Sequence, residues 1–202
     1  MGPARMAEEE PVITRELIAA AERGEEAAWR EIIEAVSPRV FSIIRNHLRR
    51  RDDHEDVAQE VFTKIFVRLG QFRGDRPFEH WVSRIALNTC HDWLRRTKVR
   101  PAVAWADLHP DEAEALDRTL ASDGPAPDEN PALVREFLDR LISTLKPREQ
   151  IVIRLLDLEE KSVQDVCELT GWGASKVKVT AMRARRKLAE QVRRLQSRQD
   201  RL

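Results

Sequence analysis

The sequence predicts an all-α protein of two small helical domains joined by an acidic flexible linker. Apolar residues recur at steps of three and four before Pro101 and after Pro131, and no alternating strand pattern stands out. Between these prolines the chain is acidic and proline-rich, which is typical of a tether. The last segment carries helix-turn-helix signals. We therefore expect one domain over 14–100, the linker over 101–131 and a helix-turn-helix domain over 132–196.

The first domain is expected to begin with a short helix around Leu17 that breaks near Gly24. A second helix follows around Ile32. Pro38 is expected to open a third helix, because proline suits the first turn of a helix.

A fourth helix is expected from about Asp53 to Leu69, with two different sides. Its buried side is expected to hold Val57, Val61, Phe62, Ile65, Phe66 and Leu69. Its other side gathers Asp56, Gln59, Glu60 and Thr63. Acids in a first turn offset the helix macrodipole, but Gln59 and Glu60 lie beyond that turn. This polar side is therefore either a solvated face or a docking site for a basic or polar protein surface.

A fifth helix is expected from about Pro77 to Lys98. One stripe is apolar and contains Phe78, Val82, Ile85, Thr89 and Trp93, with Trp81 at its edge. The opposite side carries a row at steps of four, three and four, namely Arg84, Asn88, His91 and Arg95, and Arg96 and Lys98 extend its positive charge. Such a row can bind phosphates and contact exposed bases. The alternative is a basic amphipathic helix whose tryptophans belong to the core, which we favour for Trp93 alone.

The segment from Ser162 to Leu195 predicts a helix-turn-helix. Ser162 and Asp165 can form a capping box, and Gly171 can end the short helix in a left-handed conformation. The second helix, from near Ser175, has an apolar stripe of Val177, Ala181, Ala184, Leu188, Val192 and Leu195. Its opposite face carries Ser175, Val179, Met182, Arg183 and Arg186, flanked by Lys176, Lys178, Arg185 and Lys187. A basic helix with short side chains near its start suits a DNA major groove.

Composition excludes several classes of protein. The net charge is zero, but acids dominate from Asp107 to Glu129 and bases dominate after Lys176, so the two signs are segregated along the chain. No apolar run is long enough for a membrane span, and the start lacks the features of a signal peptide. Cys90 and Cys167 have no metal-ligand spacing. We expect a cytoplasmic protein with no cofactor and no metal.

Four stretches together resemble the ECF-type bacterial sigma factors, in order and in spacing. They are DHEDVAQEVFTKIF from Asp53, FRGDRPFEHWVSRIALNTCHDWLRR from Phe72, LKPREQIVIRLLDLEEKSVQDVCELTG from Leu145 and VKVTAMRARRKL from Val177. The resemblance implies a non-catalytic transcription initiation factor. Its implied partners are core RNA polymerase, through the clamp helices of the largest subunit and the flap region, promoter DNA, and an anti-sigma factor.

The resemblance also implies roles for individual residues. The polymerase-binding residues would be Asp53, Asp56, Gln59, Glu60 and Thr63. The minus-ten element would be melted and read by Phe72, Arg76, Trp81, Arg84, Asn88, His91, Arg95, Arg96 and Lys98. The minus-thirty-five element would be read by Ser175, Lys176, Lys178, Val179, Met182, Arg183 and Arg186. The acidic linker would follow the RNA exit path.

Some residues depart from the family pattern, and two rival functions remain open. Ser175 and Lys176 stand where the family often has Gly-Thr, and Thr180 stands where it has a basic residue. One rival is a stand-alone helix-turn-helix regulator that binds duplex DNA, but it leaves the faces of the fourth and fifth helices unexplained. The other is a metal-dependent nuclease, whose carboxylates would be Asp52, Asp53, Glu55 and Asp56. Helix-start acids explain those residues more simply.

Overall fold

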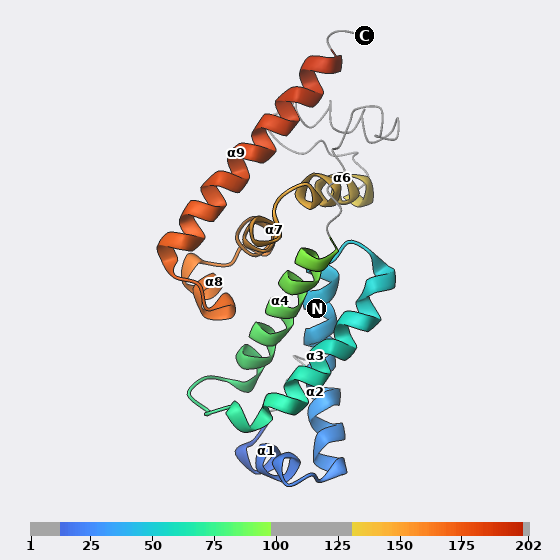
Figure 1. Ribbon diagram of the computed structural model, residues 1–202, viewed down its shortest axis with the longest axis vertical. Helices are drawn as coiled ribbons and strands as arrows, with labels where there is room; N and C mark the ends of the chain where they lie inside the picture. Colours follow the sequence, from blue (N-terminus) through green and yellow to red (C-terminus); the bar gives the residue numbers. More distant parts are fainter. Residues whose placement is uncertain (1–12, 98–130, 200–202) are drawn as a thin grey trace, which may run out of the picture. The chain divides into compact units, whose positions relative to one another are not determined.

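The computed structural model describes residues 13–97 and 131–199, and these two segments contain helices and turns without a strand (Figure 1). They form two compact units, Met1–Cys90 and His91–Leu202. The division falls within α4 (Phe78–Arg96), which is one continuous helix. The all-α prediction is confirmed. The predicted acidic linker falls almost wholly outside the described residues.

The amino-terminal unit begins with α1 (Arg15–Glu22), which packs against α2 and lies at one end of this unit in Figure 1. Thr14 caps the helix, because its hydroxyl accepts a hydrogen bond from the Leu17 N–H at 3.2 Å. Gly24 has a φ of 87°, a left-handed conformation that ends this segment as the sequence predicts.

A single long helix, α2 (Glu26–His47), follows, so the prediction of a new helix at Pro38 was wrong. Proline in a helix interior costs about 3 kcal/mol. The apolar stripe of α2 nevertheless keeps its helical spacing on both sides of Pro38. Its buried members are Ile32, Val36, Val40 and Ile44. Burying such a side chain contributes roughly 1.5–3 kcal/mol, so the stripe outweighs the proline.

The fourth helix forms where the sequence predicts it. A short 3-10 turn, η1 (Arg51–Asp53), leads into α3 (His54–Arg68), and a second turn, η2 (Leu69–Gln71), continues it. Most of the predicted apolar side is buried, but Phe66 is 62% exposed and Phe62 is half-buried. The prediction that Phe66 belongs to the buried side was wrong.

Two side-chain hydrogen bonds orient α4 against its neighbours. Arg39 Nε on α2 donates to Ser83 Oγ at 2.9 Å, and Lys64 Nζ on α3 donates to Thr89 Oγ1 at 3.1 Å. Both acceptor residues are buried. Because these bonds hold one side of α4 inward, Arg84 remains exposed on another.

The carboxy-terminal unit contains α6 (Pro131–Ser143), α7 (Pro147–Ile153), the π-helical turn η4 (Arg154–Leu158), α8 (Val163–Thr170) and α9 (Ala174–Gln199). A core cluster consists of Ile142, Leu145, Ile153 and Ala184, with Leu188 packed against it. This cluster joins α9 to the helices that precede the helix-turn-helix.

The helix-turn-helix has the capping that the sequence predicts. Ser162 Oγ accepts from the Asp165 N–H at 3.1 Å, and an Asp165 carboxylate oxygen accepts from the Ser162 N–H at 3.0 Å. Gly171 ends α8 with a φ of 73°. In the described part of the chain, no helix has both the length and the apolar character needed to cross a membrane.

Candidate nucleic-acid and protein interfaces

The polar face of α3 is divided between exposed residues and residues with partners in the protein. Asp56, Gln59 and Thr63 are exposed. Glu60 is paired with Lys64 at 2.8 Å, and its side chain is only 28% exposed. Asp53 closes η1 and is half-buried. The face therefore offers a carboxylate at Asp56 and an amide at Gln59, while Glu60 is partly used within the unit.

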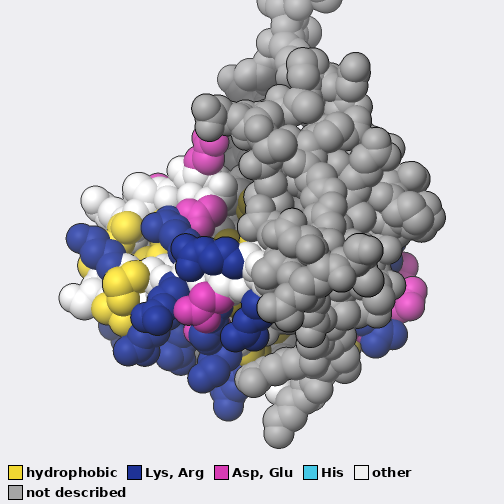
Figure 2. All heavy atoms as spheres, turned by 90° about the horizontal axis from the view of Figure 1, so that it is seen from above, with side chains coloured by type: hydrophobic (Ala, Val, Ile, Leu, Met, Phe, Trp, Pro, Cys, Tyr) yellow, Lys and Arg dark blue, Asp and Glu magenta, His cyan; other side chains and the backbone are white. Residues whose placement is uncertain are grey.

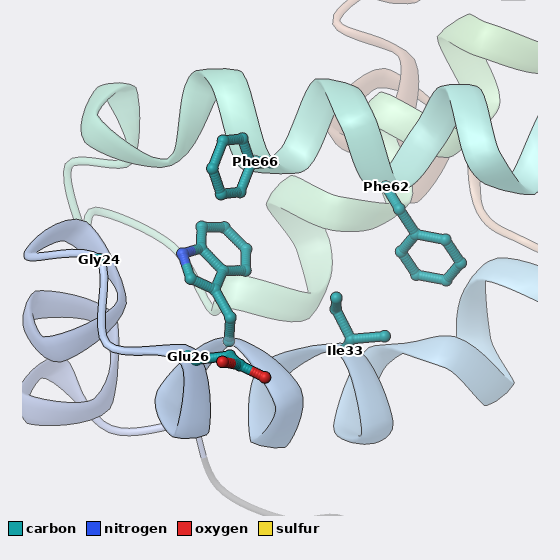
Figure 3. Close-up of a pocket in the computed structure, with 6 residues that line it drawn as sticks. Gly24, Glu26, Ile33, Phe62 and Phe66 are labelled. Carbon is teal, nitrogen blue, oxygen red and sulfur yellow. The ribbon is translucent and has the colours of Figure 1, made fainter.

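An apolar groove lies beside this face, between α2 and α3. It has a volume of about 350 Å³ and is lined by Gly24, Glu26, Trp29, Ile33, Phe62 and Phe66. Figure 3 shows Phe62 and Phe66 on α3 above Ile33 on α2. The Phe66 and Trp29 rings are 4.8 Å apart between centroids. Phe62 and Phe66 follow Gln59 by three and seven residues, so the groove adjoins the polar face.

The sequence analysis missed this groove, although one signal was present. Ile65, Phe66 and Val67 are three consecutive apolar residues of one helix, which is a wider arc than the stripe of an amphipathic helix needs. Phe66 and Val67 are 62% and 71% exposed. Exposed apolar patches of this kind mark interaction sites.

The structure brings the aromatic residues before and within α4 together. The ring centroids of Phe72 and Phe78 lie 5.1 Å apart, and those of Phe72 and Trp81 lie 5.7 Å apart. Phe72 and Trp81 therefore belong to one aromatic cluster, and both are half-buried. Arg76, in the loop between them, is exposed.

The predicted row on α4 is present on one side of the helix. Arg84 and Arg95 are exposed, whereas Asn88 and His91 are half-buried. Asp92 lies 3.6 Å from His91 Nδ1 and 3.9 Å from Arg95. The exposed Arg96 guanidinium lies 5.3 Å from the Trp93 ring centroid. Lys98, the last residue predicted for this surface, lies outside the described residues.

The exposed face of α9 matches the predicted register. Val177, Ala181 and Ala184 are buried. The residues predicted to face DNA are all exposed, namely Ser175, Lys176, Lys178, Val179, Met182, Arg183 and Arg186. Val179 and Met182 are 42% and 63% exposed, so the exposed face of α9 includes two apolar side chains.

Several basic residues of the carboxy-terminal unit are paired with acids. Lys187 Nζ contacts Glu149 at 2.6 Å, and Arg185 contacts Asp157 at 2.5 Å. Hydrogen bonds to Asp157 raise the pKa of Arg185 above its usual value. Arg186 is paired with Glu190 at 3.0 Å, but both side chains are exposed, so this pair is weak. Figure 2 shows Lys and Arg side chains gathered on the left of the view, with a few acidic and apolar side chains among them.

The acidic residues of the nuclease alternative do not form a metal site. Asp52, Glu55 and Asp56 are exposed around the start of α3. Across residues 13–97 and 131–199, no group of three or more His, Cys, Asp or Glu side chains is arranged to hold a metal ion.

The fold and these surfaces define a helix-turn-helix protein with a second helical unit. The family description "Sigma-70 region 2" matches residues 32–100, and "Sigma-70, region 4" matches residues 135–188. The RNA polymerase sigma factor YlaC of Bacillus subtilis is 31% identical over 163 residues, which are 79% of this chain and 91% of that protein. The ECF RNA polymerase sigma-E factor of Escherichia coli is 27% identical over 179 residues, which are 87% of this chain and 92% of that protein.

A solved structure supports the same fold. CnrH, in complex with the cytosolic domain of CnrY, is 21% identical with a TM-score of 0.52, over 88% of this chain and 96% of that chain. The chain belongs to the ECF-type RNA polymerase sigma factors of the sigma-70 family. It is a promoter-specific transcription initiation factor for RNA polymerase.

Proposed function

We propose that the amino-terminal unit docks on core polymerase and melts the minus-ten element, while α9 reads the minus-thirty-five element. The observation that carries this proposal is the exposed face of α9. Five neighbouring residues there, Lys176, Lys178, Val179, Met182 and Arg183, are exposed, while the opposite stripe is buried. Cations supply phosphate contacts and the two apolar side chains suit thymine methyl groups.

The proposed polymerase surface consists of the polar face of α3 and the adjoining groove. Asp56 and Gln59 would meet a basic or polar part of the clamp helices of the largest subunit, and the flap region would contact the carboxy-terminal unit. The groove at Phe66 would receive an apolar side chain from the same partner helices. Gln59, Thr63 and Phe66 are all exposed on α3, so the polar face and the groove form one continuous surface. Polar rims around apolar centres are typical of protein interfaces.

The proposed minus-ten surface is the row on α4 with the aromatic cluster before it. Arg84 and Arg95 are exposed and suited to phosphates. Asn88 lies between them and would contact a base of the separated strand. Phe72 and Trp81, which are both half-buried, would offer ring faces on which unpaired bases stack.

The proposal also includes the absence of catalytic activity, a cytoplasmic location and an anti-sigma partner. The relatives named above are sigma factors, which are not enzymes. The likeness to CnrH, solved with the cytosolic domain of CnrY, supports a protein partner.

Run-off transcription with purified core polymerase and a promoter library tests the proposed function. We expect transcripts only when the chain and core polymerase are both present, and only from templates with two separated elements. A chain that binds duplex DNA equally well alone, and adds no transcripts to core polymerase, would instead be a stand-alone regulator.

A further inference from the structure

The turn between α8 and α9 contains a tryptophan whose backbone is hydrogen-bonded to the end of α8. Trp172 lies between Gly171 and Gly173, and its backbone N–H donates to Thr170 Oγ1 at 3.2 Å. Thr170 is buried, and its hydroxyl donates to the Val166 carbonyl at 2.6 Å. The backbone of Trp172 is therefore tied to α8, and its side chain is half-buried.

Two cations from different helices lie next to this ring. The Arg148 guanidinium, from the first turn of α7, is 5.2 Å from the Trp172 ring centroid. Lys176 Nζ, from the first turn of α9, is 5.5 Å from it. Both distances are within the range of cation–π attraction. We call these three residues the Trp172 cluster.

Among the described residues, no acidic side chain is paired with either cation of the Trp172 cluster. Lys187 and Arg185 differ, because each has an acidic partner on another element. Two like charges held beside one ring repel each other, and an anion that contacts both removes that repulsion.

We propose that the Trp172 cluster binds one phosphate of the DNA backbone beside the base pairs that α9 contacts. This inference rests on the proposed function of α9. Lys176 belongs to the same exposed stretch as Lys178 and Val179, so DNA in contact with that stretch passes the cluster. A Cβ at Gly173 would meet nothing within 4 Å, so the turn next to Trp172 has open space at this residue.

In this arrangement Arg148 and Lys176 contact the phosphate, and Trp172 is a positioning residue. A guanidinium and an ammonium group together suit a phosphate, which accepts several charge-assisted hydrogen bonds. Cation–π attraction to the ring keeps the side chains of Arg148 and Lys176 close together in the protein without DNA. The cluster therefore adds affinity without reading sequence.

The test measures binding of the holoenzyme to a promoter fragment over a range of salt concentrations. We expect Trp172→Leu and Arg148→Gln each to make the slope of log K against log salt shallower by about 0.9, the value for one phosphate contact. Trp172→Phe should keep most of the slope, because an aromatic face remains. Arg135→Gln is the matched control: it removes an exposed positive charge on α6, away from the cluster, and should keep the wild-type slope.

Single methylphosphonate substitutions along the promoter identify the phosphate. One uncharged position near the upstream element should weaken the wild type and leave Trp172→Leu unaffected. Wild-type slopes in both Trp172→Leu and Arg148→Gln would overturn the cluster proposal. Arg148→Gln keeps the Trp172 ring and the turn. Its salt dependence therefore tests the cluster even if Trp172→Leu does not fold.

A scrambled upstream element separates this proposal from the proposed function. If scrambling leaves wild-type binding unchanged, α9 does not read this element and both proposals fail. If scrambling weakens wild-type binding but the cluster variants keep the wild-type slope, the cluster proposal alone is wrong.

Discussion

Lys187 on α9 and Glu149 on α7 form an ion pair that joins two helices of the carboxy-terminal unit, with Nζ and Oε1 2.6 Å apart. The Oε2 atom of Glu149 also accepts a hydrogen bond from the Lys146 N–H at 2.9 Å. Glu149 is buried, at 7% exposure. The sequence places Lys187 at the flank of the DNA-facing surface, but the structure gives it a partner inside the unit.

The first prediction concerns this pair. Lys187→Met keeps the aliphatic stem but leaves a nearly buried carboxylate with one partner fewer. We expect a loss of about 1–3 kcal/mol in the free energy of unfolding, the cost of removing a hydrogen-bond partner from a buried charged group. Urea denaturation, with hydrogen exchange followed at α7 and α9, measures it. Lys178→Met is the control, because Lys178 is exposed on the same helix. Equal stability in the two variants would contradict a structural role for Lys187.

The second prediction concerns polymerase docking. Asp56→Lys should weaken binding of core polymerase about tenfold or more, because a like charge at an interface costs several kcal/mol. Glu55→Lys is the matched control, since it reverses an exposed charge one residue earlier, off the polar face. Glu60→Lys is a poorer probe because Glu60 is paired with Lys64. Equal affinities of Asp56→Lys and Glu55→Lys, measured by titration of labelled polymerase, would remove this face from the interface.

The third prediction concerns the groove. Phe66→Ser should weaken polymerase binding but change the free energy of unfolding by less than about 1 kcal/mol, because Phe66 is 62% exposed. Val67→Ser is the control: Val67 is 71% exposed and does not line the groove. Affinity titration and urea denaturation of both variants separate binding from folding. Unchanged polymerase affinity in Phe66→Ser would mean that the groove lies outside the docking surface.

The helix-turn-helix could be predicted from the sequence because its signals are local. The capping box at Ser162 and the left-handed Gly171 each act within one turn of chain. The register of α9 was also predictable, since its buried stripe has a simple helical period. Such features need no knowledge of what packs against them.

The predictions that were wrong are those in which packing between helices outweighs the signals within one helix. Pro38 is a local signal to begin a helix, but the stripe through Val36 and Val40 continues across it because both residues are buried in the unit. Phe66 fits an apolar pattern, yet it lines a groove between α2 and α3 and is 62% exposed. The pairing of Lys187 with Glu149 depends on how α7 and α9 pack, which spacing within one helix does not specify.

The fourth prediction concerns strand separation. Asn88→Ala should reduce open-complex formation more than closed-complex formation, because unpaired bases become available only after melting. Permanganate footprinting measures open complexes, and filter binding measures both. Arg84→Gln is the comparison: as a phosphate contact it should lower salt-dependent affinity in general. A template with a pre-melted bubble should restore Asn88→Ala, and failure to do so would place its role outside strand separation.

The fifth prediction concerns the upstream element. Val179 and Met182 gain nothing from exposure to water, whereas contact with a thymine methyl in the major groove buries them. Arg183, beside them, suits guanine. We expect a guanine under Arg183 and at least one thymine methyl near Val179 or Met182, each contributing about 1–3 kcal/mol of discrimination.

Replacing each thymine of the preferred element by uracil removes only the methyl group, so it isolates that contact. At least one replacement should weaken binding of the wild type and have no effect on a Val179→Ala, Met182→Ala double variant. Arg183→Ala should relax the preference at a single base pair, because one side chain reads one base edge. If no uracil replacement weakens binding, Val179 and Met182 contact protein in the holoenzyme, and the base-reading face of α9 lies at another register.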